Sequence, residues 1–306
     1  HGATPLPPAA ALAELDDLDV TRRAAELTAQ EARALGVNWV YAPVADLDLE
    51  PRNPIVGTRS FGSDAARASA HVTAWIEGCR AGGALSCAKH FPGHGRTVAD
   101  SHAQLPVVMT SRKGLETDLA PFRAAIRAGV DSVMTAHVAF PALDPSGAPA
   151  TLSEPIVRGL LRDELGFDGA VVTDALIMEG VLEGGGGAES AAVRAVAAGC
   201  DALLYPDDPA AVAAALDAAL GERLPRGRVE AAVASIDRLA ERAAQVGAGP
   251  AEWGRPEDRA WAVEIAERAL RMVRGTPRRL PASVDLVVVD DDLGGPYPPP
   301  SREPFP

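Results

Sequence analysis

The feature that most constrains the fold is a regular alternation of short apolar runs with alanine-rich amphipathic segments. The apolar runs, several of them rich in β-branched residues, occupy residues 37–46, 83–91, 130–138, 167–176 and 199–208. The amphipathic segments occupy residues 27–36, 64–83, 119–129, 154–166 and 187–199, and most of them end in glycine. The order of strand, helix, glycine and strand is typical of a parallel sheet covered by helices on both faces. The pattern therefore predicts an α/β fold.

Length and composition agree with a barrel of the TIM type. The chain has 306 residues, of which 47% are hydrophobic and 23% are charged, as in an ordinary globular protein with a sizeable core. A single (β/α)8 barrel with an additional segment commonly reaches this length. The pattern contains about five strands where a closed barrel has eight, so we expect a TIM-type (β/α)8 barrel that lacks its first strands.

The two ends of the chain differ from the alternating region. The opening HGATPLPPAAAL reads as a loop. Residues 209–246 and 256–275 read as helices, and one more apolar strand lies within 279–295, before a proline-rich end. We predict that the barrel spans residues 1–246. Residues 247–306 are then a helical linker and the beginning of a truncated second α/β domain.

Charge and cysteine content narrow the class of partner. The formal net charge is -13, and no Lys/Arg cluster stands out that would neutralise phosphate groups, so nucleic acid and anionic membranes are unfavourable partners. The cysteines, Cys79, Cys87 and Cys200, form no CxxC pair, which indicates neither a zinc site nor a disulfide framework and favours small buried side chains. We expect a neutral or small-molecule partner, with the oligomeric state open.

No apolar run reaches the length of a membrane span, and no signal-peptide pattern is visible at the N-terminus. We therefore expect no membrane association. A cytoplasmic location is favoured over an exported one, although the chain begins with His1 and not with methionine.

Polar residues follow the predicted strands at positions where a barrel core needs only apolar side chains. They are Asp46, Lys89, His90, His137 and Asp174. In barrels and doubly wound sheets, the chemistry takes place at the carboxyl ends of the strands. This edge is therefore the expected site.

Two groups at this edge have several possible roles. The carboxylate of Asp174 can attack an anomeric carbon, stabilise an oxocarbenium ion or bind a metal, and four histidines keep the metal option open, namely His90, His94, His102 and His137. Asp100 and His102 are two residues apart, and a carboxylate beside an imidazole makes a competent proton shuttle near neutral pH. The alternative for this pair is an ordinary solvated polar loop.

Five motifs, in this order, resemble the bacterial β-N-acetylglucosaminidase (β-N-acetylhexosaminidase) branch of glycoside hydrolase family 3. They are YAPVADLD (41–48), NPIVGTRSFG (53–62), AKHFPGHG followed by DSHAQLP (88–106), TAHV (135–138) and GFDGAVVTDALIMEG (166–180). The resemblance extends from about residue 4 to residue 240. The combination of KHFPGHG with DSH is specific, because the β-glucosidase branch of the family lacks this pair and takes its acid/base carboxylate from a C-terminal domain.

The resemblance implies a retaining hydrolase that releases terminal non-reducing β-linked N-acetylhexosamine, N-acetylglucosamine in particular, from peptidoglycan or chitin fragments. It makes Asp174 the nucleophile of a glycosyl-enzyme intermediate and His102 the general acid/base, oriented by Asp100. It further implies that the residues gripping the sugar hydroxyls or forming the pocket wall are Arg59, Lys89, His90, His137 and Met178. The implied partner is a carbohydrate, with no cofactor and no metal.

The chain departs from the family pattern at its start. An upstream Asp-x-Glu-Gly-Gly-Arg motif, whose Asp and Arg also hold the sugar in relatives, is absent. We therefore expect that the first three strands are missing, either because the sequence is a fragment or because another chain completes the barrel. A histidine base does not repel an anionic acceptor, so a β-N-acetylglucosaminide phosphorylase is an alternative. A metal-dependent hydrolase and a catalytically incomplete sugar-binding fragment are the others.

Overall fold

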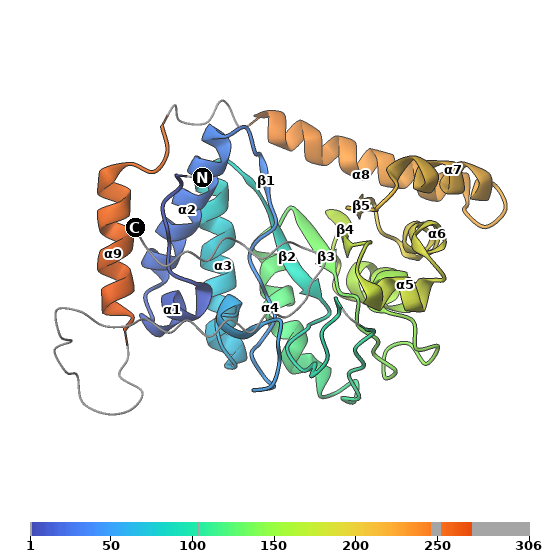
Figure 1. Ribbon diagram of the computed structural model, residues 1–306, viewed down its shortest axis with the longest axis horizontal. Helices are drawn as coiled ribbons and strands as arrows, with labels where there is room; N and C mark the ends of the chain where they lie inside the picture. The colour runs from blue at the N-terminus through green and yellow to red at the C-terminus, as the bar shows by residue number, and fades with distance from the viewer. Residues whose placement is uncertain (1, 103, 246–251, 271–306) are drawn as a thin grey trace, which may run out of the picture.

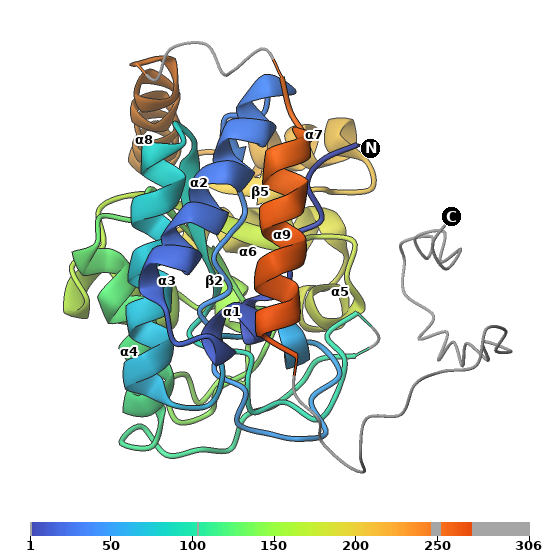
Figure 2. The same cartoon turned by 90° about the vertical axis from the view of Figure 1, so that its left-hand side faces the viewer.

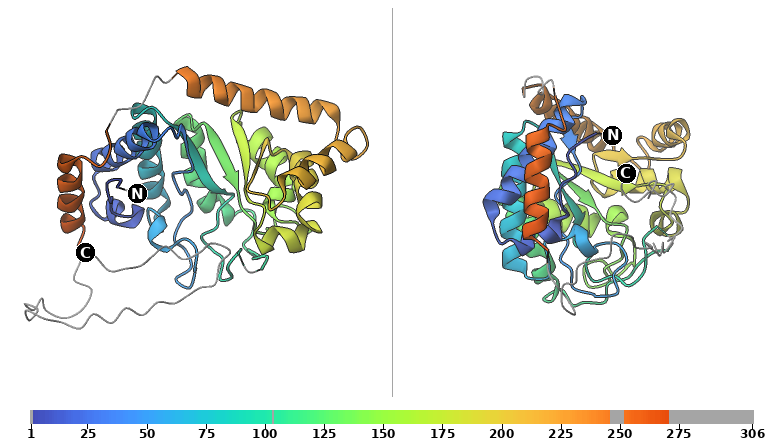
Figure 3. Two further views of the ribbon diagram at one scale, coloured as in Figure 1. Left: turned by 45° about the horizontal axis from the view of Figure 1, so that its top comes forward. Right: turned by 60° about the vertical axis from the view of Figure 1, so that its left-hand side comes forward.

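A computed structural model describes residues 2–102, 104–245 and 252–270. Within them, five parallel strands form one curled sheet in the order β1-β2-β3-β4-β5 (Figure 1). The strands are β1 (Trp39–Val40), β2 (Leu85–Phe91), β3 (Ser132–Thr135), β4 (Ala170–Ala175) and β5 (Ala202–Leu204). Each lies within one of the predicted apolar runs. The predicted α/β fold of the TIM-barrel type is confirmed as an open half-barrel, whose curvature is visible in Figure 3.

Helices separate the strands and cover the outer face of the sheet. The α-helices are α1 (Ala9–Glu14), α2 (Leu18–Ala34), α3 (Ala65–Ala81), α4 (Leu115–Arg127), α5 (Glu179–Gly185), α6 (Ala188–Ala198), α7 (Pro209–Ala219), α8 (Arg226–Gln245) and α9 (Pro256–Arg268). Two short 3₁₀ turns, η1 (Gly57–Arg59) and η2 (Ala150–Leu152), and a π-helix, η3 (Pro155–Glu164), complete the described elements. The helices of the five predicted amphipathic segments lead into glycines with positive φ, namely Gly36, Gly83, Gly129, Gly166 and Gly199, as the sequence pattern predicts.

The prediction of a loop over residues 1–12 is confirmed for residues 2–8, which lie in no helix or strand. It is wrong for Ala9–Leu12, because α1 occupies Ala9–Glu14. Its AAALAE sequence contains strong helix formers, and Leu12 is buried in the main core. Burial of one apolar face stabilises a helix that is too short to be stable alone.

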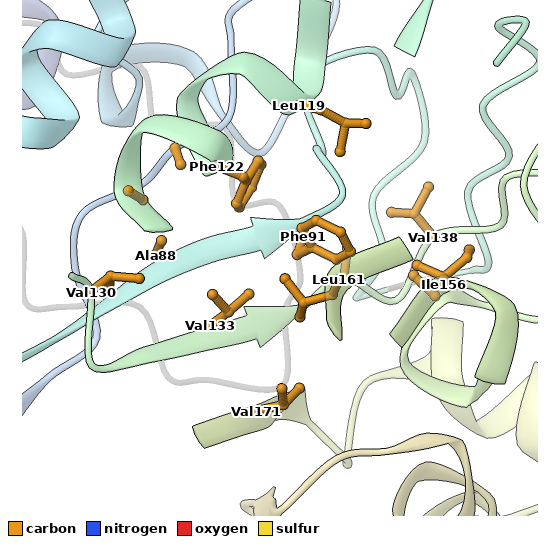
Figure 4. Packing of buried hydrophobic residues seen from close by; sticks show 14 of the residues in the cluster. Ala88, Phe91, Leu119, Phe122, Val130, Val133, Val138, Ile156, Leu161 and Val171 are labelled. Carbon is orange, nitrogen blue, oxygen red and sulfur yellow. The ribbon is translucent and has the colours of Figure 1, made fainter. Parts of the chain in front are cut away.

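Residues alternate between the two faces of the sheet, as expected for strands buried on both sides. On the outer face, Val133 and Val171 pack with the helices in the main core, in which Phe91 and Phe122 meet edge to face at 5.3 Å (Figure 4). On the inner face a second cluster is formed by Cys87, Met134 and Val172, with partly buried Trp39, Tyr41, Ala202 and Leu204. The predicted burial of the three cysteines is confirmed.

Helix α8 lies against the amino ends of the strands. Its Leu239 and Ala243 pack against Leu85 and Ala170, the first residues of β2 and β4. The buried Asp131 at the start of β3 accepts hydrogen bonds from Ser86 N and Oγ at 2.8 and 3.1 Å and pairs with Arg242 of α8. The amino end of the sheet is therefore covered, which leaves the carboxyl end for chemistry.

Helix α9 packs beside α2 (Figure 2). The guanidinium of Arg23 lies 4.1 Å from the ring centroid of Trp261, and Gly254 N donates to the Glu31 carboxylate at 2.7 Å.

The predicted helix in 256–275 is confirmed as far as Arg268. The strand predicted in 279–295 lies outside the described residues, and the predicted domain boundary at residue 246 stays a prediction. None of the helices described is long and apolar enough to cross a membrane.

Candidate functional site

A cavity of about 230 Å³ opens at the carboxyl edge of the sheet. It brings together six of the residues singled out from the sequence, namely Arg59, Lys89, His90, His102, Asp174 and Met178. Ile55, His94 and Ser101 complete its lining. These residues come from β2 and the loop that follows it, from β4 and the segment between β4 and α5, and from η1 and the segment just before it. They lie together because parallel strands end at one edge.

Asp174 projects from the end of β4 and is largely buried, with a side-chain exposure of 19%. Its Oδ1 accepts a hydrogen bond from Ala175 N at 2.8 Å. Burial alone raises the pKa of this carboxyl, but the charges of His90, His137 and Lys89 and the Ala175 hydrogen bond outweigh it, so the pKa of Asp174 lies below its ordinary value. The carboxylate is therefore ionised at neutral pH and can act as a nucleophile.

His90 stands between two carboxylates. Its Nδ1 lies 2.7 Å from Oδ2 of Asp46, and its Nε2 lies 3.8 Å from Oδ2 of Asp174. Although burial raises the pKa of Asp46, His90 and His94 lower it overall, so this carboxylate is ionised and can only accept. Nδ1 of His90 therefore carries a proton, and Nε2 faces Asp174.

Lys89 and Arg59 supply positive charge to the cavity. Burial and the nearby Arg59 guanidinium lower the pKa of Lys89 below its ordinary value, while Asp174 and Asp46 oppose the shift. Arg59 lies in η1 and is exposed, and its Nη1 donates to the Ile55 carbonyl at 3.2 Å. Both side chains are cationic donors of the kind that bind hydroxyl or anionic oxygens.

The Asp100–His102 pair forms a dyad at the mouth of the cavity. Oδ1 of Asp100 lies 2.7 Å from Nδ1 of His102 and also accepts the backbone N–H of His102 at 2.8 Å. Both side chains are a little over one quarter exposed, at 28% and 27%. Because the carboxylate fixes the ring through Nδ1, Nε2 is the nitrogen that would transfer a proton to or from a bound substrate.

The loop that follows β2 and carries the dyad, residues 92–102, is tied to the segment after β1 and to α4. His94 N donates to Asp46 Oδ1 at 2.7 Å, and Asn53 Nδ2 donates to the His94 carbonyl at 2.8 Å. Arg96 forms an ion pair with Asp118 of α4 at 3.0 Å. These contacts position the loop over the cavity.

The ring of His94 serves the interior of this loop. Its Nδ1 lies 2.8 Å from Thr97 Oγ1, and its Nε2 lies 3.0 Å from Ser101 Oγ. Burial lowers the pKa of His94 to about 4, so the ring is neutral near pH 7. The ring therefore links the start of the loop to Ser101, the residue between Asp100 and His102.

Gly95 is required by a close backbone approach. An ideal Cβ at this position would overlap the Leu47 carbonyl oxygen, and the Gly95 carbonyl accepts Leu49 N and Glu50 N at 3.3 and 3.1 Å. We expect Gly95→Ala to reduce the free energy of unfolding by about 2 kcal/mol or more, because the two backbone segments must separate. Urea denaturation measures this loss.

The matched control for that substitution is Gly227→Ala in α8. The Cβ of this variant meets no heavy atom within 4 Å, and alanine favours a helix over glycine by up to about 1 kcal/mol. The control is expected to be neutral or slightly stabilising. A Gly95→Ala protein as stable as the wild type would contradict the close approach.

His137 and Met178 occupy different places relative to the cavity. Met178 is buried and lines it, immediately before α5. His137 is fully buried outside the lining, where its Nδ1 lies 2.8 Å from Thr151 Oγ1 and its Nε2 lies 3.0 Å from the Ala175 carbonyl. Its ring supports the backbone next to Asp174, and burial lowers its pKa. The roles assigned to these residues stay predictions.

One carboxylate central to the site was noted in the sequence only as a strand-end residue. Asp46 contacts His90 and His94, which are 44 and 48 positions away, so spacing gives no sign of the contact. The available signal was its position at the end of an apolar run. Among the described residues, no group of three His, Cys, Asp or Glu side chains is arranged to hold a metal ion.

Comparison with known proteins identifies the relatives of this chain. The model of the glycosyl hydrolase family 3 N-terminal domain matches residues 1–239. A β-N-acetylglucosaminidase/β-glucosidase of Cellulomonas fimi is 35% identical over 319 residues, which cover 93% of this chain and 54% of the relative.

Two solved structures are similar in fold and sequence. A family 3 β-N-acetylglucosaminidase from Paenibacillus sp. str. FPU-7 superposes with a TM-score of 0.85 and 38% identity, covering 91% of this chain and 55% of the other. A Neisseria gonorrhoeae protein in complex with N-trifluoroacetyl-D-glucosamine gives a TM-score of 0.71 and 29% identity, covering 88% and 77%. The chain spans about half the length of the Cellulomonas and Paenibacillus proteins.

Proposed function

Because this chain belongs to glycosyl hydrolase family 3, we propose that its cavity hydrolyses terminal non-reducing β-linked N-acetylhexosamine residues, N-acetylglucosamine in particular. One observation carries the proposal: the ionised carboxylate of Asp174 and the Asp100–His102 dyad serve the same cavity. The relatives named β-N-acetylglucosaminidase and the neighbour that binds N-trifluoroacetyl-D-glucosamine support the choice of sugar. Peptidoglycan or chitin fragments are the proposed source of the substrate.

In the first step, Asp174 attacks the anomeric carbon and the glycosidic C–O bond breaks. His102 gives its Nε2 proton to the departing oxygen, while Asp100 stabilises the ring through Nδ1. The product of this step is a glycosyl ester of Asp174.

In the second step, neutral His102 takes a proton from a water molecule, whose oxygen attacks the anomeric carbon and releases Asp174. Two inversions at the same carbon give net retention of configuration. Lys89, His90 and Arg59 are positioned to hold the sugar's hydroxyl groups during both steps.

The test is the release of 4-nitrophenol from 4-nitrophenyl N-acetyl-β-glucosaminide by this chain, with the first-formed sugar anomer followed by proton NMR. We expect the β-anomer to appear first and to convert to the equilibrium mixture only later. Initial release of the α-anomer would contradict a covalent intermediate on Asp174. Binding of N-acetylglucosamine without turnover would favour the alternative of a sugar-binding fragment.

The same assay separates hydrolysis from phosphorolysis. A histidine base carries no negative charge to repel an anionic acceptor, and Lys89 and Arg59 place cations in the cavity. Formation of the sugar 1-phosphate in phosphate buffer, in place of the free sugar, would favour a phosphorylase.

A further inference from the structure

The buried carboxylate of Asp46 connects the two halves of the cavity. It lies in the segment that follows β1, and its side chain is 0% exposed. Its hydrogen-bond donors are the ring and backbone N–H of His90 and the backbone N–H of His94. Oδ2 lies 2.7 Å from His90 Nδ1, and Oδ1 accepts His90 N at 3.1 Å and His94 N at 2.7 Å. The His90 ring faces Asp174. His94 lies near the start of the loop, residues 92–102, that carries the Asp100–His102 dyad.

We propose that Asp46 is a positioning residue that holds the His90 ring with Nε2 toward Asp174 and, through His94 N, sets the loop that carries the Asp100–His102 dyad. A free imidazole can rotate about its side-chain bonds and exchange the positions of its two nitrogens. Asp46 removes this freedom, because its ionised carboxylate can only accept a hydrogen bond. The bond at 2.7 Å therefore forms only when the ring turns a protonated Nδ1 toward Asp46. The orientation of His90 rests on the structure, and its effect on turnover rests on the proposed function.

The loss of this acceptor has a specific electrostatic consequence for the nucleophile. Charged and titratable groups surround Asp174. They are Cys87, Lys89 and His90 on β2, His94 in the loop after β2, His137 after β3, and Arg59 and His102 in the cavity lining. Among the groups that lower the pKa of Asp174, His90 has the largest effect. If the His90 ring turns away, the pKa of Asp174 rises, and activity is lost at a higher pH as the solution is acidified.

The kinetic test compares Asp46→Asn with two controls. An asparagine has one acceptor oxygen where the carboxylate has two, so the His90 and His94 donors cannot all be satisfied. We expect kcat to fall by about 10²-fold, as for a reacting group displaced by a fraction of an ångström to one ångström, and the acidic limb of the kcat/KM profile to move to higher pH.

The controls separate positioning from general damage. Asp48→Asn changes an exposed carboxylate two residues away and is expected to leave both parameters unchanged. Asp118→Asn weakens the Arg96 pair that also ties the loop. Among the described residues, the ion pair of Asp118 is with Arg96 and not with His90. This variant is expected to lower kcat without moving the acidic limb. An equal shift of that limb in Asp118→Asn would overturn the proposal in favour of simple loosening of the loop.

A spectroscopic measurement tests the orientation without any turnover. Long-range ¹H–¹⁵N NMR reports which nitrogen of each imidazole carries a proton, and His90 is assigned among the six histidines by its absence in His90→Gln. We expect a protonated, strongly hydrogen-bonded Nδ1 in the wild type and loss of this signature in Asp46→Asn. A wild-type His90 with unprotonated Nδ1 would overturn the proposal. Since this result needs no substrate, failure of the proposed function would be recognised separately by the absence of nitrophenol release.

Discussion

Asp174→Asn is expected to reduce the rate of nitrophenol release by about 10⁴-fold or more, as removal of a nucleophile does in other covalent mechanisms. The amide is nearly the same size as the carboxylate but is a poor nucleophile and carries no charge. Asp174 sits among His90, His137 and Lys89, whose charges lower its pKa, so the wild-type group is ionised throughout the neutral range. The measurement is kcat on 4-nitrophenyl N-acetyl-β-glucosaminide at saturating substrate.

The matched control for the nucleophile is Asp168→Asn. Asp168 is an exposed aspartate just before β4, at the opposite end of the strand from Asp174. Its replacement is expected to leave kcat and the thermal midpoint unchanged. An Asp174→Asn protein with wild-type turnover would refute the assignment of the nucleophile, and with it the proposed mechanism.

His102→Ala is expected to lower turnover by about 10²- to 10⁴-fold, the range that general acid–base catalysis contributes. The size of the loss should depend on the leaving group. Nitrophenolate needs little protonation to leave, so the loss of His102 slows its departure less than the departure of a natural sugar alcohol. The comparison of kcat/KM for the nitrophenyl glycoside and for a disaccharide of N-acetylglucosamine measures this difference.

The second role of His102 is tested by adding azide to the variant. Azide is a nucleophile that needs no base, so it should accelerate release of the sugar from the Asp174 ester and give a glycosyl azide of retained configuration. Asp100→Asn keeps the imidazole but loses the carboxylate that holds Nδ1 at 2.7 Å, so it should give a smaller loss than His102→Ala. Equal losses on both substrates and no effect of azide would exclude His102 as the acid/base.

The elements of the fold were largely predictable because hydrophobic periodicity is a local property of the chain. The strands end at Phe91 and Ala175, within the predicted runs, since a buried strand must be apolar on both faces wherever it lies in the sequence. The helix at Ala9–Glu14 was missed because its stability comes from packing of Leu12 in the core and not from its length. The π-helical geometry of Pro155–Glu164 is likewise absent from the sequence pattern.

For the candidate site, the sequence by itself determined which residue types stand at the strand ends and which motifs surround them. Only the tertiary structure decided their partners. It placed Asp46 between His90 and His94, directed both nitrogens of His94 into its own loop, and turned the ring of His137 to Thr151 and the Ala175 carbonyl. The physical reason is that periodicity and spacing depend on neighbours along the chain. The orientation of a buried polar side chain depends on donors and acceptors that folding brings together from distant segments.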